Sequence, residues 1–165
     1  AGDVVIVNGG IEAADDVGAR SVSTVNGAIR FGKQARIDGD VETVNGGIFI
    51  DRGGNVRDDV STVNGAIGLV DTDLGGGIET VNGDVTVGVG SHVKGGIHVE
   101  KPTGNYGVQW GKQRIPRIVI GPDAVVDGAL VFERDVVLYV HQTARIGSVR
   151  GATPKSYNTA TPPKD

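Results

Sequence analysis

The sequence predicts an all-β protein, specifically a β-solenoid: a single-stranded parallel β-helix of triangular cross-section, with about seven coils of roughly 18–19 residues. The seven-residue phrase STVNGAI begins at Ser23 and again at Ser61. In this phrase and its near-copies, asparagines recur at steps of 18, 19, 19 and 18 residues: Asn8, Asn26, Asn45, Asn64 and Asn82. The residues between them are rich in Val, Ile, Thr and Gly, which favours short strands over helices. We expect right-handed coils.

Apolar residues recur at fixed distances from each asparagine, as stacked coils require. The position four residues before it holds Val4, Val22, Val41, Val60 and Ile78. The position three residues after it holds Ile11, Ile29, Ile48, Ile67 and Val85. The position five residues after it holds Ala13, Phe31, Ile50, Leu69 and Val87. A third face, about eleven residues after it, holds Ile37, Val56 and Val93, with Leu74 one residue early. Three apolar faces per coil predict a triangular prism with a dry centre.

Two further columns lie immediately before the asparagine. The first holds Thr24, Thr43, Thr62 and Thr80, and we expect it to point inward with its hydroxyls bonding along the stack. The second holds Val7, Val25, Val44, Val63 and Val81. These valines are predicted either to form a partly exposed stripe, which often marks association, or to be tucked under a corner.

The Asn-Gly pair within each phrase is predicted to be a corner, because both residues tolerate positive φ. Asparagines stacked at such a corner can hydrogen-bond to one another along the column. A binding groove built from these amides is the alternative interpretation.

The period continues after Asn82, although the phrase itself fades. The stretch HVKGGIHV supplies Ile97 and Val99 as inward residues. Ile118, Ile120, Val126, Leu130 and Phe132 follow in RIVIGPDAVVDGALVF, and VLYVHQTARIG adds Leu138 and Val140. The solenoid is therefore predicted to occupy residues 1–150, and the Thr- and Pro-rich residues 151–165 are expected to form a C-terminal tail.

An insert at residues 100–117 interrupts the solenoid and is predicted to be a protruding loop. Aromatic and cationic side chains gather in it, and these are the predicted ligand-binding residues: Tyr106, Trp110, Lys112 and Arg114. Such a set suits sugars, an anionic polysaccharide or another protein. The alternative is a hairpin whose tryptophan folds back onto the solenoid wall.

Composition excludes several classes of protein. A net charge of −4 argues against nucleic acid as the main partner, and the lack of any long apolar stretch argues against a membrane span. The chain has 28 glycines but neither cysteine nor methionine. The absence of oxidisable sulfur and the start at Ala1 predict an exported protein, extracellular or at the cell surface, with its signal peptide removed.

The sequence offers no catalytic constellation, and we predict no enzyme activity, no cofactor and no metal site. His92, His98 and His141 fall in different columns, so they cannot share one metal within a chain, which leaves only an intersubunit zinc site open. Acidic pairs at coil ends are interpreted as solvated corners rather than calcium or catalytic sites: Asp38 and Asp40, Asp58 and Asp59, and Asp71 and Asp73. No phosphate loop or activated-serine motif occurs.

The phrases STVNGAI and ETVNGGI, with GGIHVEKP and RIVIGPDAVVDGALVFERDVVLYV, resemble bacterial exported adhesin-like proteins with β-strand repeats. In period and glycine placement the chain is also similar to bactofilins. These resemblances imply a non-catalytic β-solenoid, with head-to-tail polymerisation in the bactofilin case. The insert, the tail and the expected export depart from bactofilins and argue against a cytoskeletal role.

The open first coil leads to the predicted function, because no helical segment precedes GDVVIVNGG and its strand edges are free to pair with another copy. We expect a structural protein whose main partner is itself and which forms an extracellular or cell-surface filament. The predicted contacts are Val4, Val5, Ile6 and Val7 in the first coil and Leu138, Val140 and Ile146 in the last. The alternative is a monomeric adhesin that binds a polysaccharide or a cell surface through its insert.

Overall fold

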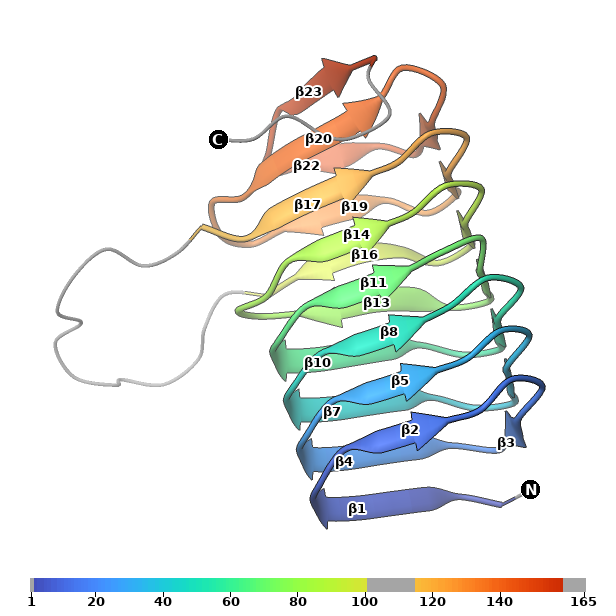
Figure 1. Cartoon of the computed structure of the whole chain (residues 1–165). Coiled ribbons are helices and arrows are strands. Elements are labelled where there is room, and N and C mark those ends of the chain that lie inside the picture. The colour runs from blue at the N-terminus through green and yellow to red at the C-terminus, as the bar shows by residue number, and fades with distance from the viewer. Residues whose placement is uncertain (1, 101–114, 159–165) are drawn as a thin grey trace, which may run out of the picture.

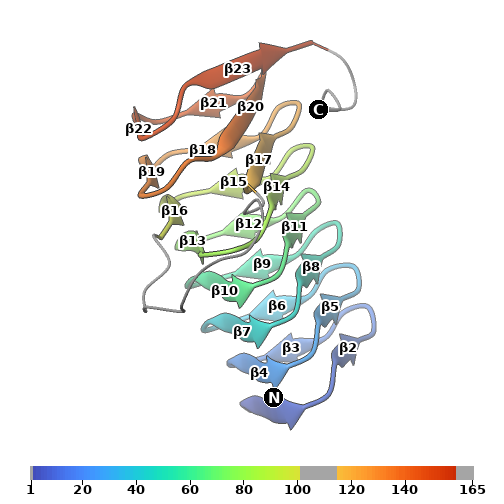
Figure 2. The same cartoon turned by 90° about the vertical axis from the view of Figure 1, so that its left-hand side faces the viewer.

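The computed structural model describes residues 2–100 and 115–158 and confirms the predicted fold class. In these residues, 23 short strands and no helix wind into a β-solenoid (Figure 1). Each coil contributes one strand to each of three parallel sheets, which we call sheets A, B and C (Figure 2). Seven coils are complete, and an eighth has strands in sheets A and B only. None of the described residues forms a helix able to cross a membrane.

The strands of each sheet follow one another at intervals of one coil. Sheet A contains β1 (Val4–Asn8), β4 (Val22–Asn26), β7 (Val41–Asn45), β10 (Val60–Asn64), β13 (Gly77–Thr80), β16 (Gly96–Val99), β19 (Leu130–Phe132) and β22 (Val149–Arg150). Sheet B contains β2 (Ile11–Ala13), β5 (Ile29–Phe31), β8 (Ile48–Ile50), β11 (Ile67–Leu69), β14 (Val85–Val87), β17 (Arg117–Ile120), β20 (Val137–His141) and β23 (Pro154–Tyr157). Sheet C contains β3 (Gly18–Ala19), β6 (Arg36–Ile37), β9 (Asn55–Val56), β12 (Asp73–Leu74), β15 (His92–Val93), β18 (Val125–Val126) and β21 (Arg145–Ile146).

The apolar columns meet in a single core, as predicted. Val22 pairs with Val41, and Ile29 pairs with Ile48, so equivalent residues of successive coils lie directly above one another. The inward side chains Ile29, Ile37 and Val41 are each no more than 1% exposed. Because side chains alternate along a strand, the residue between two core positions points to solvent, as in the buried-exposed-buried pattern of β5 and β8.

The Asn-Gly corners between sheets A and B are built differently from the prediction. None of the five asparagines has positive φ, and Gly9 is the only one of the five glycines after them that does. Positive φ occurs mainly at the corner between sheets B and C, in Asp16, Gln34, Gly53, Asp71, Gly90 and Asp123. Glycine is required after the asparagine for a different reason, which is space: a Cβ on Gly46 would lie 2.0 Å from the carbonyl oxygen of Gly27.

The asparagines and threonines connect the coils. From Asn26 to Asn82, each asparagine amide nitrogen donates to the side-chain oxygen of the asparagine one coil earlier, at 2.8–3.0 Å, which confirms the predicted ladder. The threonine column points inward, also as predicted, and Thr24 and Thr43 are only 3–4% exposed. Their hydroxyls bond along the stack, as predicted, by donating to backbone carbonyls of the preceding coil: Thr43 Oγ1 bonds the Gly27 oxygen at 3.0 Å.

The solenoid continues past residue 150, into the stretch expected to be a tail. β23 pairs in parallel with β20, placing Pro154 beside Leu138. Pro154 occupies the column that holds Ile29 and Ile48 in earlier coils. In those coils the backbone N–H donates to the following coil: Ile29 N bonds the Gly47 oxygen, and Ile48 N bonds the Ala66 oxygen. Pro154 occupies the last coil, so its missing N–H removes no bond to β20. A proline-containing segment can therefore close sheet B.

Candidate functional site

The N-terminal end of the rod leaves its core layer partly uncovered. Val4 is 36% exposed, whereas its equivalents Val22 and Val41 are 1% and 0% exposed. Ile11 is likewise only half-buried. The outward-pointing Val5 and Val7 are 71% and 59% exposed. Within the described residues, the outer edges of β1, β2 and β3 have no strand partner. Four apolar side chains and three open strand edges thus lie at this end of the rod.

The C-terminal end is formed by β22 and β23 rather than by the strands that were expected there. Leu138 is 1% exposed and Val140 is paired with Ser156, so both lie beneath β23 and not at the rim. Ile146 is at the rim, because β21 is the last strand of sheet C. The sequence reasoning ended one coil early because Pro154 and Ser156 stand in β23 where the preceding coil has Leu138 and Val140.

The two ends carry opposite charge. Residues 2–21 contain four acidic side chains (Asp3, Glu12, Asp15 and Asp16) and one basic one, Arg20, and all five are exposed. Residues 145–158 contain three basic side chains (Arg145, Arg150 and Lys155) and no acidic one, and these three are also exposed. The first coil is therefore an acidic end and the last coils a basic end.

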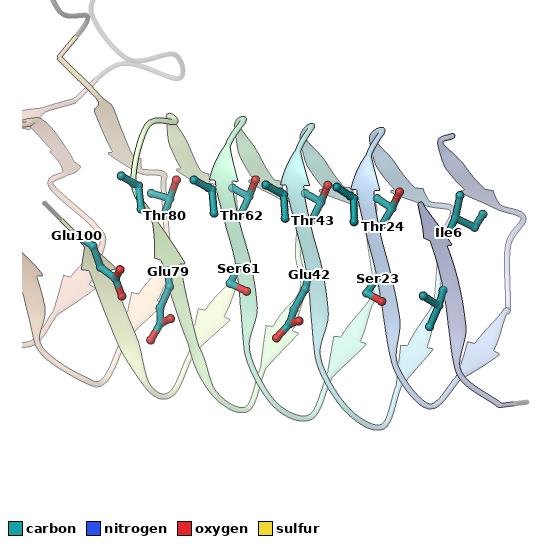
Figure 3. Close-up of a pocket in the computed structure, with 15 residues that line it drawn as sticks. Ile6, Ser23, Thr24, Glu42, Thr43, Ser61, Thr62, Glu79, Thr80 and Glu100 are labelled. Atoms are coloured by element: carbon teal, nitrogen blue, oxygen red, sulfur yellow. The ribbon is translucent and has the colours of Figure 1, made fainter. Parts of the chain in front are cut away.

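A groove of about 430 Å³ runs along the outer face of sheet A over the first coils (Figure 3). One wall is the predicted valine stripe, in which Val25, Val44 and Val63 are 39–40% exposed. The other wall is a row of outward residues that share one column: Val5, Ser23, Glu42, Ser61 and Glu79. The structure thus confirms the stripe and adds an acidic wall, which sequence reasoning missed because this column was not followed.

The three histidines lie in three different sheets, as predicted, but two of them have carboxylate partners. His92 Nε2 lies 2.6 Å from Asp127 Oδ2 on sheet C, and His98 Nε2 lies 2.5 Å from Glu133 Oε2 on sheet A. Glu79 and Glu100 flank His98, and one ligand atom from each of these three residues lies within 4.8 Å of the others. Column alignment would have revealed this group, because Glu79 and His98 occupy successive coils of one column.

The acidic corners support the coil backbone. Asp40 Oδ1 accepts a hydrogen bond from Asp59 N at 3.0 Å, and Asp59 Oδ1 accepts one from Gly77 N at 2.7 Å. Asp15 Oδ1 does the same for Lys33 N at 2.7 Å. These carboxylates hold the next coil's backbone, which agrees with their interpretation as corners.

Aromatic and cationic residues cover the outer face of sheet B near the C-terminal end. Tyr157 packs on Val119 and Tyr139, and its ring meets the His141 ring edge-on with the centroids 5.0 Å apart. The Arg117 guanidinium lies over the Tyr139 ring at 5.1 Å. Burial raises the pKa of Tyr157, and the charge of Arg117 opposes this effect. This cluster fixes β23 to the rod.

The predicted ligand-binding residues of the insert, Tyr106, Trp110, Lys112 and Arg114, lie outside the described residues. The insert falls between β16, which ends at Val99, and β17, which begins at Arg117, and thus at the corner position where earlier coils have Asn-Gly. The asparagine ladder ends one coil before this point. Its last member, Asn82, accepts a bond of 2.6 Å from Arg134 Nη1 on the far side of the insert.

Comparison with protein-family models, with curated proteins and with solved structures gives no match for this chain. The fold alone therefore defines its class, which is that of a β-solenoid repeat protein. The resemblance to adhesin-like proteins and bactofilins stays an expectation from the sequence.

Proposed function

We propose that this chain is an exported structural protein that assembles head to tail into a filament through the two ends of its solenoid. The observation that carries the proposal is the exposure of the first core layer. Val4 is 36% exposed at a position where the equivalent side chain is buried in each of the other six complete coils, such as Val41 at 0% and Ile78 at 0%. Burial of these side chains and edges by a second copy would be favourable.

A second copy fits this end because the solenoid supplies its own template. All three sheets are parallel. The strands of the last coil therefore run in the same direction, and follow one another in the same order, as the strands of every inner coil. Stacking another first coil on it extends sheet A by pairing β22 with β1 of the next copy. Such a contact is heterologous and does not close, so repetition gives a filament.

Charge and register support the same partner. The acidic end of one copy would face the basic end of the next, which favours association in this orientation. Glu12 and Lys155 occupy the same outward column of sheet B. Glu12 begins this column and pairs with Arg30, and Lys155 ends it and pairs with Tyr139. Continuing this column across the junction places Lys155 of one copy directly beside Glu12 of the next.

The last coil also sets limits on the junction. Pro154 offers no N–H to the next strand of sheet B, and sheet C ends one strand earlier than the other two sheets. The proposed junction therefore relies mainly on sheet A, where β22 presents Val149 and Arg150. An edge that carries proline and lysine pairs less readily than an inner strand, so we expect assembly to depend on concentration.

The test is to measure the molar mass of the full chain by light scattering over a range of concentrations, and to image the concentrated sample by electron microscopy. We expect mass to rise with concentration and unbranched rods to form. Val4→Asp, which adds charge to an already exposed position, should remain folded by circular dichroism but stay monomeric. A wild-type chain that stays monomeric throughout, or a Val4→Asp variant that assembles normally, would contradict the proposal.

A further inference from the structure

We infer that the outer face of sheet A carries a divalent metal site, with Glu79, His98 and Glu100 as ligands and Glu133 as a fourth donor, and that it selects a zinc-like ion. The site lies on the outer side of the rod, across the fifth to seventh coils, and contains none of the residues proposed to pair at the junction. It is therefore independent of the proposed assembly.

Strand register brings the ligands together. Glu79 in β13 is the direct partner of His98 in β16, so their side chains project from adjacent strands on the same face. Glu100 follows His98 by two residues and returns to that face, because side chains alternate along a strand. Figure 3 shows Glu79 and Glu100 next to each other at one end of the groove. One donor atom from each of Glu79, His98 and Glu100 lies within 4.8 Å of the others.

Glu133 completes the set from the following coil. Its Oε2 lies 2.5 Å from His98 Nε2, and the Glu133 backbone N–H is bonded to the Val99 oxygen, which holds this residue beside β16. Three carboxylate side chains thus surround one imidazole. Mutual repulsion of three carboxylates on one surface is unfavourable, and a bound cation relieves it.

The donor types select the metal. An imidazole nitrogen with carboxylate oxygens suits Zn²⁺, whereas Ca²⁺ and Mg²⁺ take oxygen ligands only. Tetrahedral ligands about 2.0–2.1 Å from zinc are roughly 3.3 Å apart. Donors up to 4.8 Å apart must therefore approach by up to about 1.5 Å, and His98 Nε2 and Glu133 Oε2, which lie 2.5 Å apart, must separate by about 0.8 Å. Glu79 is exposed, and rotation of its side chain on a rigid strand can supply this movement.

The position of the site suggests that the metal connects coils that the asparagine ladder does not reach. Asparagine side chains connect the first five coils, and this ladder ends at Asn82, one coil before the insert. Beyond the end of the ladder, Arg134 Nη1 donates to Asn82 Oδ1 and to the Val81 backbone oxygen. A metal held by Glu79, His98 and Glu133 would link the fifth, sixth and seventh coils, where the ladder no longer does so.

The competing explanation is an ordinary surface ion pair between His98 and Glu133. The chain provides a matched case for this explanation in His92 and Asp127, which lie 2.6 Å apart, and both imidazoles are 37% exposed. Within residues 2–100 and 115–158, however, only the group around His98 has three metal-binding side chains this close. Comparison of the two histidines therefore separates a metal site from a simple pair.

The experiment is calorimetric titration of the full, chelator-treated chain with ZnCl₂, together with Co²⁺ absorption as a probe of coordination. We expect one zinc per chain and a visible Co²⁺ spectrum of tetrahedral type. His98→Gln should weaken zinc binding at least tenfold and Glu100→Gln severalfold, whereas His92→Gln should bind zinc like the wild type. Circular dichroism checks that each variant is folded.

Three results would each overturn the inference. The first is a wild-type chain that binds no zinc, and the second is equal loss of binding in His92→Gln and His98→Gln. The third is binding that His98→Gln leaves unchanged, which would indicate loose attraction of cations to the acidic groove. The monomeric Val4→Asp variant should bind zinc normally, so a failure of assembly and a failure of metal binding can be told apart.

Discussion

Gly46 lies so close to Gly27 of the preceding coil that a Cβ on Gly46 would be 2.0 Å from the Gly27 carbonyl oxygen. The same relationship recurs up the corner: a Cβ on Gly65 would meet the Gly46 oxygen at 2.0 Å. Each corner glycine therefore sets how closely the coils stack. The asparagine ladder depends on this spacing, since its amide bonds are only 2.8–3.0 Å long.

Gly46→Ala is predicted to destabilise the fold by at least about 2 kcal/mol, because the added methyl group must displace backbone rather than a flexible side chain. Gly18→Ala is the control, since its Cβ would have only one ordinary contact, 3.9 Å from the Arg36 oxygen. Chemical denaturation at a fixed protein concentration measures both. Equal stability of the two variants would show that the corner does not need glycine.

Two buried threonines give a second, matched prediction. Thr62 Oγ1 donates to the Gly46 oxygen at 3.0 Å, whereas Thr80 Oγ1 is buried with no hydrogen-bond partner among the described residues. Thr62→Val should therefore cost about 1 kcal/mol, and Thr80→Val should be neutral or stabilising by up to ~1 kcal/mol. The later coil already carries Val99 in this column. A larger loss in Thr80→Val than in Thr62→Val, measured by denaturation, would contradict the assigned bonds.

Tyr157 predicts a dependence of stability on alkaline pH. Burial raises the pKa of Tyr157 in the folded chain, although the charge of Arg117 lowers it in part. The unfolded chain then loses the tyrosine proton first, so stability is unaffected below about pH 10 and falls as pH rises from there toward the folded-state pKa. Tyr157→Phe should flatten this fall. The measurements are the free energy of unfolding against pH and the tyrosinate absorbance, each compared between the wild type and Tyr157→Phe. Identical pH profiles of the two proteins would refute a contribution of Tyr157 to the loss of stability.

The columns of the solenoid were predictable because each coil repeats the same alternation of inward and outward side chains. Val41 and Ile48 could be assigned to the core from spacing alone, whereas the sequence left open whether Val44, which is 39% exposed, belongs to a stripe or lies under a corner. The position of the corner and its asparagine ladder were predicted correctly, but the backbone conformation of the corner was not. Asn-Gly has the same sequence whether glycine is needed for positive φ or for close stacking, and only the distance between coils distinguishes the two.

The parts that sequence reasoning missed have a common physical cause. The group around His98 joins residues on both sides of the insert, so Glu133 is distant in sequence but adjacent in the stack. β23 was missed because Pro154 is unfavourable in an inner strand and harmless at an edge, and the sequence does not show which strand is last. Periodicity predicts the interior of a repeat protein better than its ends and interruptions.

The central claim is that the two ends of the rod pair in register, and a charge-reversal experiment on Glu12 and Lys155 tests it most directly. In the proposed junction, Glu12→Lys or Lys155→Glu places like charges side by side, so each variant alone should assemble roughly 5- to 30-fold more weakly, as expected for a change of about 1–2 kcal/mol. An equimolar mixture of the two, or the double variant, restores opposite charges at each junction and should recover assembly in light scattering. Assembly that both single variants retain in full, or that the mixture fails to recover, would contradict the account.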